Sequence, residues 1–284
     1  MPTLKDFIAR AANTSAGWAV IARIWRLDDK LQRLVRFAER HRATQKTEDF
    51  YSQVRSKFQD SSVRHGPFKG LKYGALESSG SSLLPKLLGS YENELHPWLE
   101  TAADRNYDLI VDIGCAEGYY AVGLARLFPS AQVLAYDTNP EAQKSCAQLA
   151  RMNEVDARIT LGSFCDPATL QSLDLSGKAL IICDCEGYEA DLFDAATAAH
   201  LARADVLIEC HDLVGRPITR DLIAAFEATH KVSIVGTTPD HVKALELALP
   251  ELTGEPYPVR LYMVEEQRRA PQNFLIFEAL NPAG

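Results

Sequence analysis

The chain has 284 residues, of which 46% are hydrophobic and 24% are charged, as in an ordinary soluble globular protein with one large domain or a domain and an appendage. It contains no stretch near the roughly 20 apolar residues of a membrane-spanning helix and no signal peptide at its start, so we expect a cytoplasmic location. The net charge of −8 is unevenly distributed along the chain. Residues 1–72 hold 15 basic and 7 acidic residues, whereas the remainder holds 15 basic and 31 acidic residues. A main body this acidic is a poor partner for nucleic acid.

Residues 1 to about 60 are predicted to form a long amphipathic helix. Apolar side chains recur at spacings of three and four from Trp18 to Ala38, with Arg and Lys between them. The apolar face of such a helix needs a surface to cover. The alternatives are the main domain, a second subunit in a homodimer, a substrate pocket and a membrane surface. Loops rich in Ser, Gly and Pro follow between residues 60 and 90. We therefore expect a helical N-terminal extension over residues 1–70 and a second domain over residues 71–284.

Apolar, strand-like runs alternate with helical segments from Tyr107 to the end of the chain. The runs are DLIVDIG, AQVLAYD, ARITLGSF, ALIICDC, ADVLIEC, KVSIVGT and NFLIFEAL. Strands separated by helical spacers are typical of βαβ units and of a parallel sheet that is covered on both faces. The last run has no helix after it and can add an antiparallel strand. The predicted fold is therefore α/β, a doubly wound, mostly parallel seven-stranded sheet.

A glycine loop, VDIGCAEGYYAVGLA, follows the first predicted strand. Gly114 and Gly118 allow a tight turn and a close approach of a ligand to the backbone. The loop lacks the second glycine of the dinucleotide pattern G-x-G-x-x-G, and Asp112 and Glu117 would repel a pyrophosphate. These acids suit a cationic nucleoside such as S-adenosylmethionine, which carries a sulfonium and an ammonium group.

Polar residues also end the next two predicted strands. Asp137 and Asn139 follow the second strand in AYDTN, where a carboxylate can accept hydrogen bonds from ribose hydroxyls. Ser163 and Phe164 follow the third strand in LGSFCD, and with Asp166 they suit the edge and face of an adenine. Because ligands of doubly wound sheets bind at the strand ends, these residues are predicted to bind the cofactor.

Residues 107–280 resemble a class I S-adenosylmethionine-dependent methyltransferase. DIGCAEGYY resembles the first motif of that family and AYDTN the second. The resemblance implies that the glycine loop holds the methionine part of the cofactor and that Asp137 holds its ribose. Glu117 stands where the family often has a glycine.

The segment ALIICDCEGYEADLF narrows the resemblance. Its D-x-E-G-x-E pattern, formed by Asp184, Glu186, Gly187 and Glu189, is similar to that of the FkbM-like methyltransferases. These enzymes are largely associated with O-methylation in natural-product and glycan pathways. The resemblance therefore implies a hydroxyl of a small molecule or carbohydrate as the acceptor.

A second acidic segment, VLIECHDL, ends the fifth predicted strand with Glu209 and His211. The fourth and fifth strands are expected to be neighbours, so both residues should share a pocket with Asp184 and Glu186. A hydroxyl acceptor must lose or weaken its proton. His211 or Glu186 can act as general base, or a divalent cation such as Mg²⁺ can be held by Asp184, Glu209 and His211. Structural capping of helix N-termini is the third interpretation, and Glu189 is expected to be solvated.

The predicted function is S-adenosylmethionine-dependent O-methyl transfer, with or without a divalent metal. Two other classes stay open. One is an NAD-dependent oxidoreductase, against which the missing glycine counts. The other is a non-catalytic module that docks another protein through the basic N-terminal helix.

Overall fold

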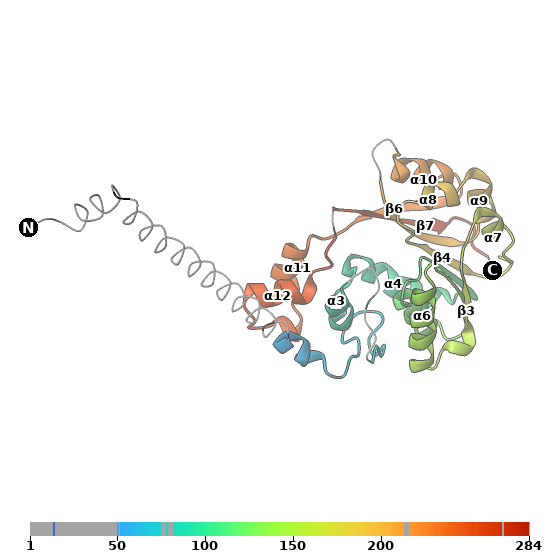
Figure 1. Cartoon of the computed structure of the whole chain (residues 1–284). Helices are drawn as coiled ribbons and strands as arrows, with labels where there is room; N and C mark the ends of the chain where they lie inside the picture. The colour runs from blue at the N-terminus through green and yellow to red at the C-terminus, as the bar shows by residue number, and fades with distance from the viewer. Residues whose placement is uncertain are drawn as a thin grey trace, which may run out of the picture. The chain divides into compact units, whose positions relative to one another are not determined.

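The computed structural model describes Thr14, Phe50 and residues 52–74, 78, 82–212, 216–268 and 270–283 (Figure 1). The amphipathic helix predicted over residues 1–60, and with it the homodimer contact, lies almost entirely outside the described residues. Phe58–Gly284 form one compact unit, which therefore includes residues 58–70 of the predicted extension. Within the described part of the chain, no helix has the length and hydrophobicity to cross a membrane.

A seven-stranded sheet forms the centre of the compact unit. Its strands are β1 (Leu109–Ile113), β2 (Gln132–Tyr136), β3 (Ile159–Gly162), β4 (Ala179–Cys183), β5 (Asp205–Cys210), β6 (His230–Gly236) and β7 (Asn273–Ala279). They lie in the order β3-β2-β1-β4-β5-β7-β6. The first five pair in parallel, whereas β7 is antiparallel to both β5 and β6. The prediction of a doubly wound, mostly parallel seven-stranded sheet is thus confirmed, together with its antiparallel last strand.

Helices lie before the first strand and in the connections between later strands. Before β1 come η1 (Ser56–Phe58), α3 (Leu83–Leu88), η2 (Asn93–Leu95), α4 (His96–Ala102) and η3 (Ala103–Arg105). Between β1 and β6 come α5 (Tyr119–Leu127), α6 (Pro140–Met152), η4 (Asp156–Arg158), α7 (Pro167–Gln171), α8 (Glu189–Leu192), α9 (Ala195–His200) and α10 (Ile218–Phe226). Between β6 and β7 come α11 (Asp240–Glu246), η5 (Pro250–Leu252) and α12 (Tyr257–Val264).

The chain between β4 and β5 forms two short helices, α8 and α9. The break is at Phe193 and Asp194. The Asp194 side chain accepts a hydrogen bond from the backbone N–H of Thr197 at 2.7 Å and so caps the start of α9. The stop leaves α8 only four residues long, directly after the acidic segment.

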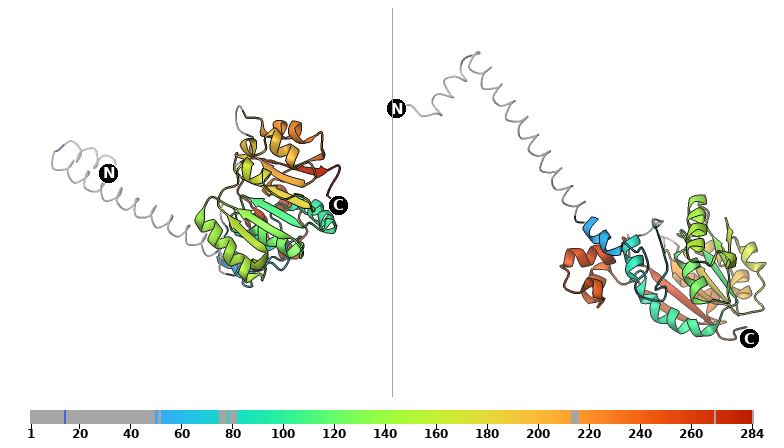
Figure 2. Two further views of the ribbon diagram at one scale, coloured as in Figure 1. Left: turned by 90° about the vertical axis from the view of Figure 1, so that its right-hand side faces the viewer. Right: turned by 90° about the horizontal axis from the view of Figure 1, so that it is seen from below.

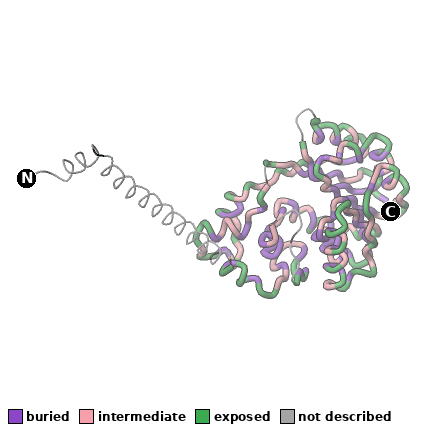
Figure 3. Tube along the Cα trace, viewed as in Figure 1, coloured by how far each residue is buried: buried purple, intermediate pink, exposed green. Residues whose placement is uncertain are grey.

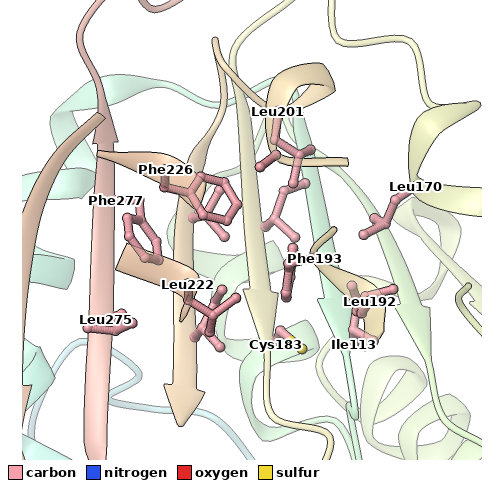
Figure 4. Packing of buried hydrophobic residues seen from close by; sticks show 14 of the residues in the cluster. Ile113, Leu170, Cys183, Leu192, Phe193, Leu201, Leu222, Phe226, Leu275 and Phe277 are labelled. Carbon is pink, nitrogen blue, oxygen red and sulfur yellow. The ribbon is translucent and has the colours of Figure 1, made fainter. Parts of the chain in front are cut away.

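One face of the sheet packs against α7 to α10 in a hydrophobic cluster (Figure 4). Alternate residues of a strand point to the same face, so Val111 and Ile113 of β1 enter this cluster together. Phe226 of α10 stacks on Phe277 of β7 with ring centroids 4.5 Å apart. The helix α5 contacts β1 and β2, and Figure 2 shows the layers from two further directions. The central strands β1, β4 and β5 are consequently almost fully buried, whereas the strands β3 and β6 at the edges are partly exposed, and Figure 3 shows burial along the trace.

The insertion between β6 and β7 is tied to the region before β1. Its α12 packs against α3, and the buried Lys243 of α11 pairs with Glu94 at 2.9 Å and with Glu266. Pairing offsets a burial cost of several kcal/mol for each isolated charge. The chain then continues through Arg268 into β7, and the Arg268 side chain pairs with Glu209 of β5.

Candidate active site

A cavity of about 570 Å³ lies at the carboxyl ends of β1 to β4, where doubly wound sheets bind their ligands. The loops after these four strands form much of its wall. Six of the nine residues predicted to bind the cofactor line it: Asp112, Gly114, Glu117, Asp137, Ser163 and Phe164. The other three, Gly118, Asn139 and Asp166, are not among the lining residues.

Two glycines shape the connection between β1 and α5. Gly114 has a φ of +88°, and a Cβ atom there would lie 1.7 Å from the carbonyl oxygen of Asp184 in the loop after β4. Only glycine permits this contact between two loops of the cavity wall. Gly118 has a φ of +98°, and its Cβ would meet the Sγ atom of Cys146 on α6 at 2.7 Å. Gly118 therefore serves the packing of α5 on α6.

Asp137 is held rigidly where β2 ends. Its Oδ2 atom accepts a hydrogen bond from the backbone N–H of Ala116 at 2.9 Å, and its Oδ1 atom accepts one from Asn139 at 2.7 Å. The side chain of Asn139 accepts from the backbone N–H of Glu141 at 3.0 Å and caps α6. The carboxylate of Asp137 thus faces the cavity in a fixed orientation, with Asn139 supporting it from outside.

Asp112 supplies a buried carboxyl group with an unsatisfied oxygen. The residue is 3% exposed and lines the cavity, and its Oδ2 atom has no hydrogen-bond partner in the described structure. Burial raises the pKa of Asp112 to about 7. The backbone of Ala121 opposes this rise in pKa, and the carboxylates of Asp184, Asp137 and Glu117 add to it. A cationic ligand would satisfy this group, whereas an anion would be repelled.

Glu117 is already paired. Its Oε1 atom accepts hydrogen bonds from Lys86 Nζ at 2.6 Å, Tyr73 Oη at 3.0 Å and Ser78 Oγ at 3.2 Å. From the sequence, Glu117 was expected to favour a cationic ligand together with Asp112. Lys86 and Tyr73 escaped notice because they lie 31 and 44 residues earlier in the chain, in segments without a motif.

Ser163 and Phe164 line the cavity wall after β3. Phe164 is 53% exposed, with its ring centroid 5.4 Å from that of Tyr188. An exposed ring beside a cavity offers a stacking surface. Asp166 has a different task, because its side chain accepts from the backbone N–H of Thr169 at 2.8 Å and caps α7.

His211 joins the acids of the loop after β4. Its Nε2 atom lies 3.7 Å from Asp184 Oδ1 and 3.7 Å from Glu186 Oε2. The meeting follows from the parallel pairing of β4 with β5, which aligns Cys183 with Ile208. Burial alone would lower the pKa of His211. The hydrogen bond to Glu189 and the charge of Asp184 outweigh burial, so the pKa is raised.

Glu189 corrects a sequence expectation. The residue is fully buried rather than solvated, and its Oε1 atom lies 2.9 Å from His211 Nδ1. The same oxygen accepts from the backbone N–H of Cys185 at 3.2 Å. Burial would raise the pKa of Glu189, but the hydrogen bond from His211 prevails and the pKa is lowered. Glu189 thus ties the loop after β4 to the one after β5.

Glu209 stands apart from this group. It is 4% exposed and pairs with Nη1 of Arg268. The same guanidinium group pairs through Nη2 with Glu92 at 2.6 Å and through Nε with Glu266 at 2.9 Å. Burial raises the pKa of Glu209 to about 10, and Asp184 adds to the shift. Among the described residues, the three side chains that could hold one cation are Asp184, Glu186 and His211, whose ligand atoms lie within 4.8 Å of one another. Glu209 was predicted as a ligand and is not in that set.

No protein-family profile and no curated protein sequence matches the chain. Solved structures do. One is a precorrin-6y C5,15-methyltransferase from Geobacter metallireducens, with 13% identity over 65% of this chain and 88% of that one and a TM-score of 0.43. Another is an SAH-bound methyltransferase from Podospora anserina, with 14% identity, coverage of 69% and 79%, and a TM-score of 0.38. A third is a [4+2]-cyclase, with 14% identity, coverage of 66% and 82%, and a TM-score of 0.41. Such distant likenesses do not assign an activity to this chain.

Proposed function

We propose that this chain is an S-adenosylmethionine-dependent methyltransferase that methylates a hydroxyl of a small molecule or sugar. The observation that carries the proposal is the acidic lining of the cavity at the strand ends. Asp112, Asp137 and Asp184 line it, and Asp112 presents a buried oxygen without a partner. A nucleoside with a sulfonium and an ammonium group compensates such a wall, whereas the pyrophosphate of NAD would add to its repulsion.

The cavity residues divide the binding of this cofactor among them. Asp137 is oriented by two backbone N–H groups to accept hydrogen bonds from the ribose hydroxyls. Ser163 and Phe164 would contact the adenine edge and face. When it is bound, S-adenosylmethionine supplies an electrophilic methyl group.

His211 is the proposed general base. When its Nδ1–H donates to Glu189, Nε2 is left as the proton acceptor on the side of Asp184 and Glu186. A proton taken from the acceptor hydroxyl by Nε2 creates an imidazolium, which the buried Glu189 carboxylate stabilises. Glu186, the other predicted base, has a side chain that is 87% exposed and lacks such support.

A divalent cation is the second route to an activated hydroxyl. Two carboxylates and an imidazole, from Asp184, Glu186 and His211, can hold a cation such as Mg²⁺ or Mn²⁺. The carboxylate that fixes the far nitrogen of His211 is also what a metal-ligating histidine usually has. Turnover that is lost in EDTA and restored by Mg²⁺ would favour this route, and turnover unchanged in EDTA would favour His211 as the base.

The D-x-E-G-x-E segment supports an FkbM-like subfamily within this proposal. Its three acids, Asp184, Glu186 and Glu189, all reach His211. An O-methyl acceptor follows from that resemblance and from the presence of a supported base.

Isothermal calorimetry tests the cofactor assignment. The purified chain should bind S-adenosylmethionine and S-adenosylhomocysteine, and Asp137→Ala should weaken both about tenfold or more because a hydrogen-bonded, charged partner is lost. Asp166→Ala is the matched control, since this acid caps α7 outside the cavity lining and should leave affinity unchanged. Binding of NAD in place of both ligands would overturn the proposal in favour of an oxidoreductase.

A further inference from the structure

A second cavity, of about 520 Å³, lies at the end of the sheet opposite to the candidate active site. Its lining includes Lys178 directly before β4, Asp205 at the start of β5 and Ala279 at the end of the antiparallel β7. Among the described residues, none lines both cavities. The volume is within the range of about 300–1,000 Å³ of small-molecule sites, so the second cavity can hold a ligand of its own.

Basic side chains dominate the charge of the second cavity. Its charged lining residues are four bases and two acids, namely Arg105, Lys178, Arg203 and Lys231 against Asp205 and Glu278. The chain around it has the opposite balance, because residues 73–284 hold 15 basic and 31 acidic residues. A cavity that gathers charge of one sign attracts ligands of the other sign. The second cavity therefore suits an anion.

The two acids of the second cavity already have partners. Asp205 Oδ2 pairs with Arg105 Nη1 at 2.6 Å and accepts a hydrogen bond from the hydroxyl of Tyr107 at 2.6 Å. Glu278 pairs with Arg105 and, at 3.2 Å, with Lys231 Nζ. These contacts occupy Arg105 and Lys231 and leave neither acid to neutralise the other two bases.

Lys178 and Arg203 are those two bases. Neither side chain forms a hydrogen bond or an ion pair within the part of the chain that the structure describes. Leu180 of β4 is in register with Asp205 of β5, and the two bases lie two residues before these positions. Neighbouring strands are about 4.8 Å apart, so two like charges come from adjacent segments of the chain. A ligand that brings negative charge to both relieves their repulsion.

We propose that the second cavity binds a small phosphate ester through Lys178 and Arg203. Phosphate oxygens accept charge-assisted hydrogen bonds from an ammonium group and from the planar fork of a guanidinium group. Apolar surface is also present, because Leu280 is 57% exposed and lines the cavity together with Pro282. The ligand therefore combines a phosphate with an apolar group. This inference is independent of the proposed function, which concerns the other end of the sheet.

Calorimetry on the full chain, with phenyl phosphate as the probe, tests the second cavity. Phenyl phosphate should bind more tightly than inorganic phosphate, and its affinity should fall as the salt concentration rises. Lys178→Met and Arg203→Met should each lower the affinity about tenfold or more, since a charge-assisted hydrogen bond is lost. Neither substitution leaves an acid unpaired, so the unfolding midpoint of the free protein should not fall.

Two exposed bases outside the second cavity provide matched controls. Lys144 pairs with Glu141 at 2.6 Å, and Arg220 pairs with Asp221 at 2.9 Å. Lys144→Met and Arg220→Met change the net charge by the same amount as the cavity variants. Both should bind phenyl phosphate as the wild type does.

Loss of affinity in the cavity variants alone would support the proposal. Wild-type affinity in the double variant Lys178→Met/Arg203→Met, equal losses in the controls, or no binding of phenyl phosphate at millimolar concentration would overturn it. Equal affinity for inorganic phosphate would overturn the apolar part of the ligand. Competition with S-adenosylhomocysteine would place the phosphate in the other cavity and also overturn the proposal. Failure of phenyl phosphate to bind would leave the proposed function standing, because that function is tested by the binding of S-adenosylhomocysteine.

Discussion

The contact between Gly114 and the loop after β4 makes a sharp prediction for Gly114→Ala. A Cβ at position 114 would lie 1.7 Å from the carbonyl oxygen of Asp184, whereas real Cβ contacts are almost never shorter than 3.0 Å. The two loops must therefore separate by more than 1 Å. A left-handed φ costs an alanine about 1–2 kcal/mol, and forced overpacking adds about 1–3 kcal/mol. We expect the free energy of unfolding to fall by about 2–5 kcal/mol.

Gly254→Ala provides the matched control for Gly114→Ala. Gly254 has a φ of +77°, close to that of Gly114, but nothing lies within 4 Å of its added Cβ. This variant should lose only the conformational part, about 1–2 kcal/mol, and should bind S-adenosylhomocysteine normally. Urea unfolding and calorimetry measure both quantities. If Gly114→Ala matched the control in stability and in affinity, the two loops would not be in the contact on which the cavity depends.

Three further predictions follow from the site and the core. Affinity for S-adenosylmethionine should rise about fivefold from pH 6 to pH 7, because Asp112, with its pKa raised to about 7, is mostly protonated at the lower pH while the ligand keeps its ammonium; calorimetry of Asp112→Asn should show no such rise. Glu189→Gln should slow the formation of S-adenosylhomocysteine from S-adenosylmethionine and a panel of small hydroxyl acceptors by roughly tenfold or more, because His211 loses its charged partner. The affinity of the variant for S-adenosylhomocysteine should not change, and equal rates in the variant and the wild type would contradict this role. Phe277→Ala should cost about 3–5 kcal/mol in urea unfolding through loss of the stack on Phe226, and a loss below about 1 kcal/mol would refute the packing.

The sheet, and the part of the cavity wall formed by the glycine loop and Asp137, were predictable because they depend on patterns within short stretches of sequence. Alternating strand and helix patterns define the βαβ units, and the ends of parallel strands meet at one edge of the sheet. Asp137 and the glycine loop come directly after strands, so their place was determined by the topology. The encounter of His211 with Asp184 followed in the same way from the pairing of β4 with β5.

The pairings across long stretches of chain were out of reach of the sequence. Arg268 lies in the insertion before β7, 59 residues after Glu209 in the sequence, and pairs with it. No periodicity in the sequence predicts that contact. Lys86 reaches Glu117 from a segment that reads as a loop. Glu189 was misjudged because α8 is a helix of four residues, too short for its pattern to show which side is buried. Its partner His211 follows the end of another strand, β5.

A crystal structure of the chain grown with S-adenosylhomocysteine tests the central claim most directly. The account predicts that the ligand occupies the cavity at the ends of β1 to β4, with its ribose on Asp137 and its adenine against Phe164. An empty cavity at saturating ligand, or a ligand bound elsewhere on the molecule, would contradict it.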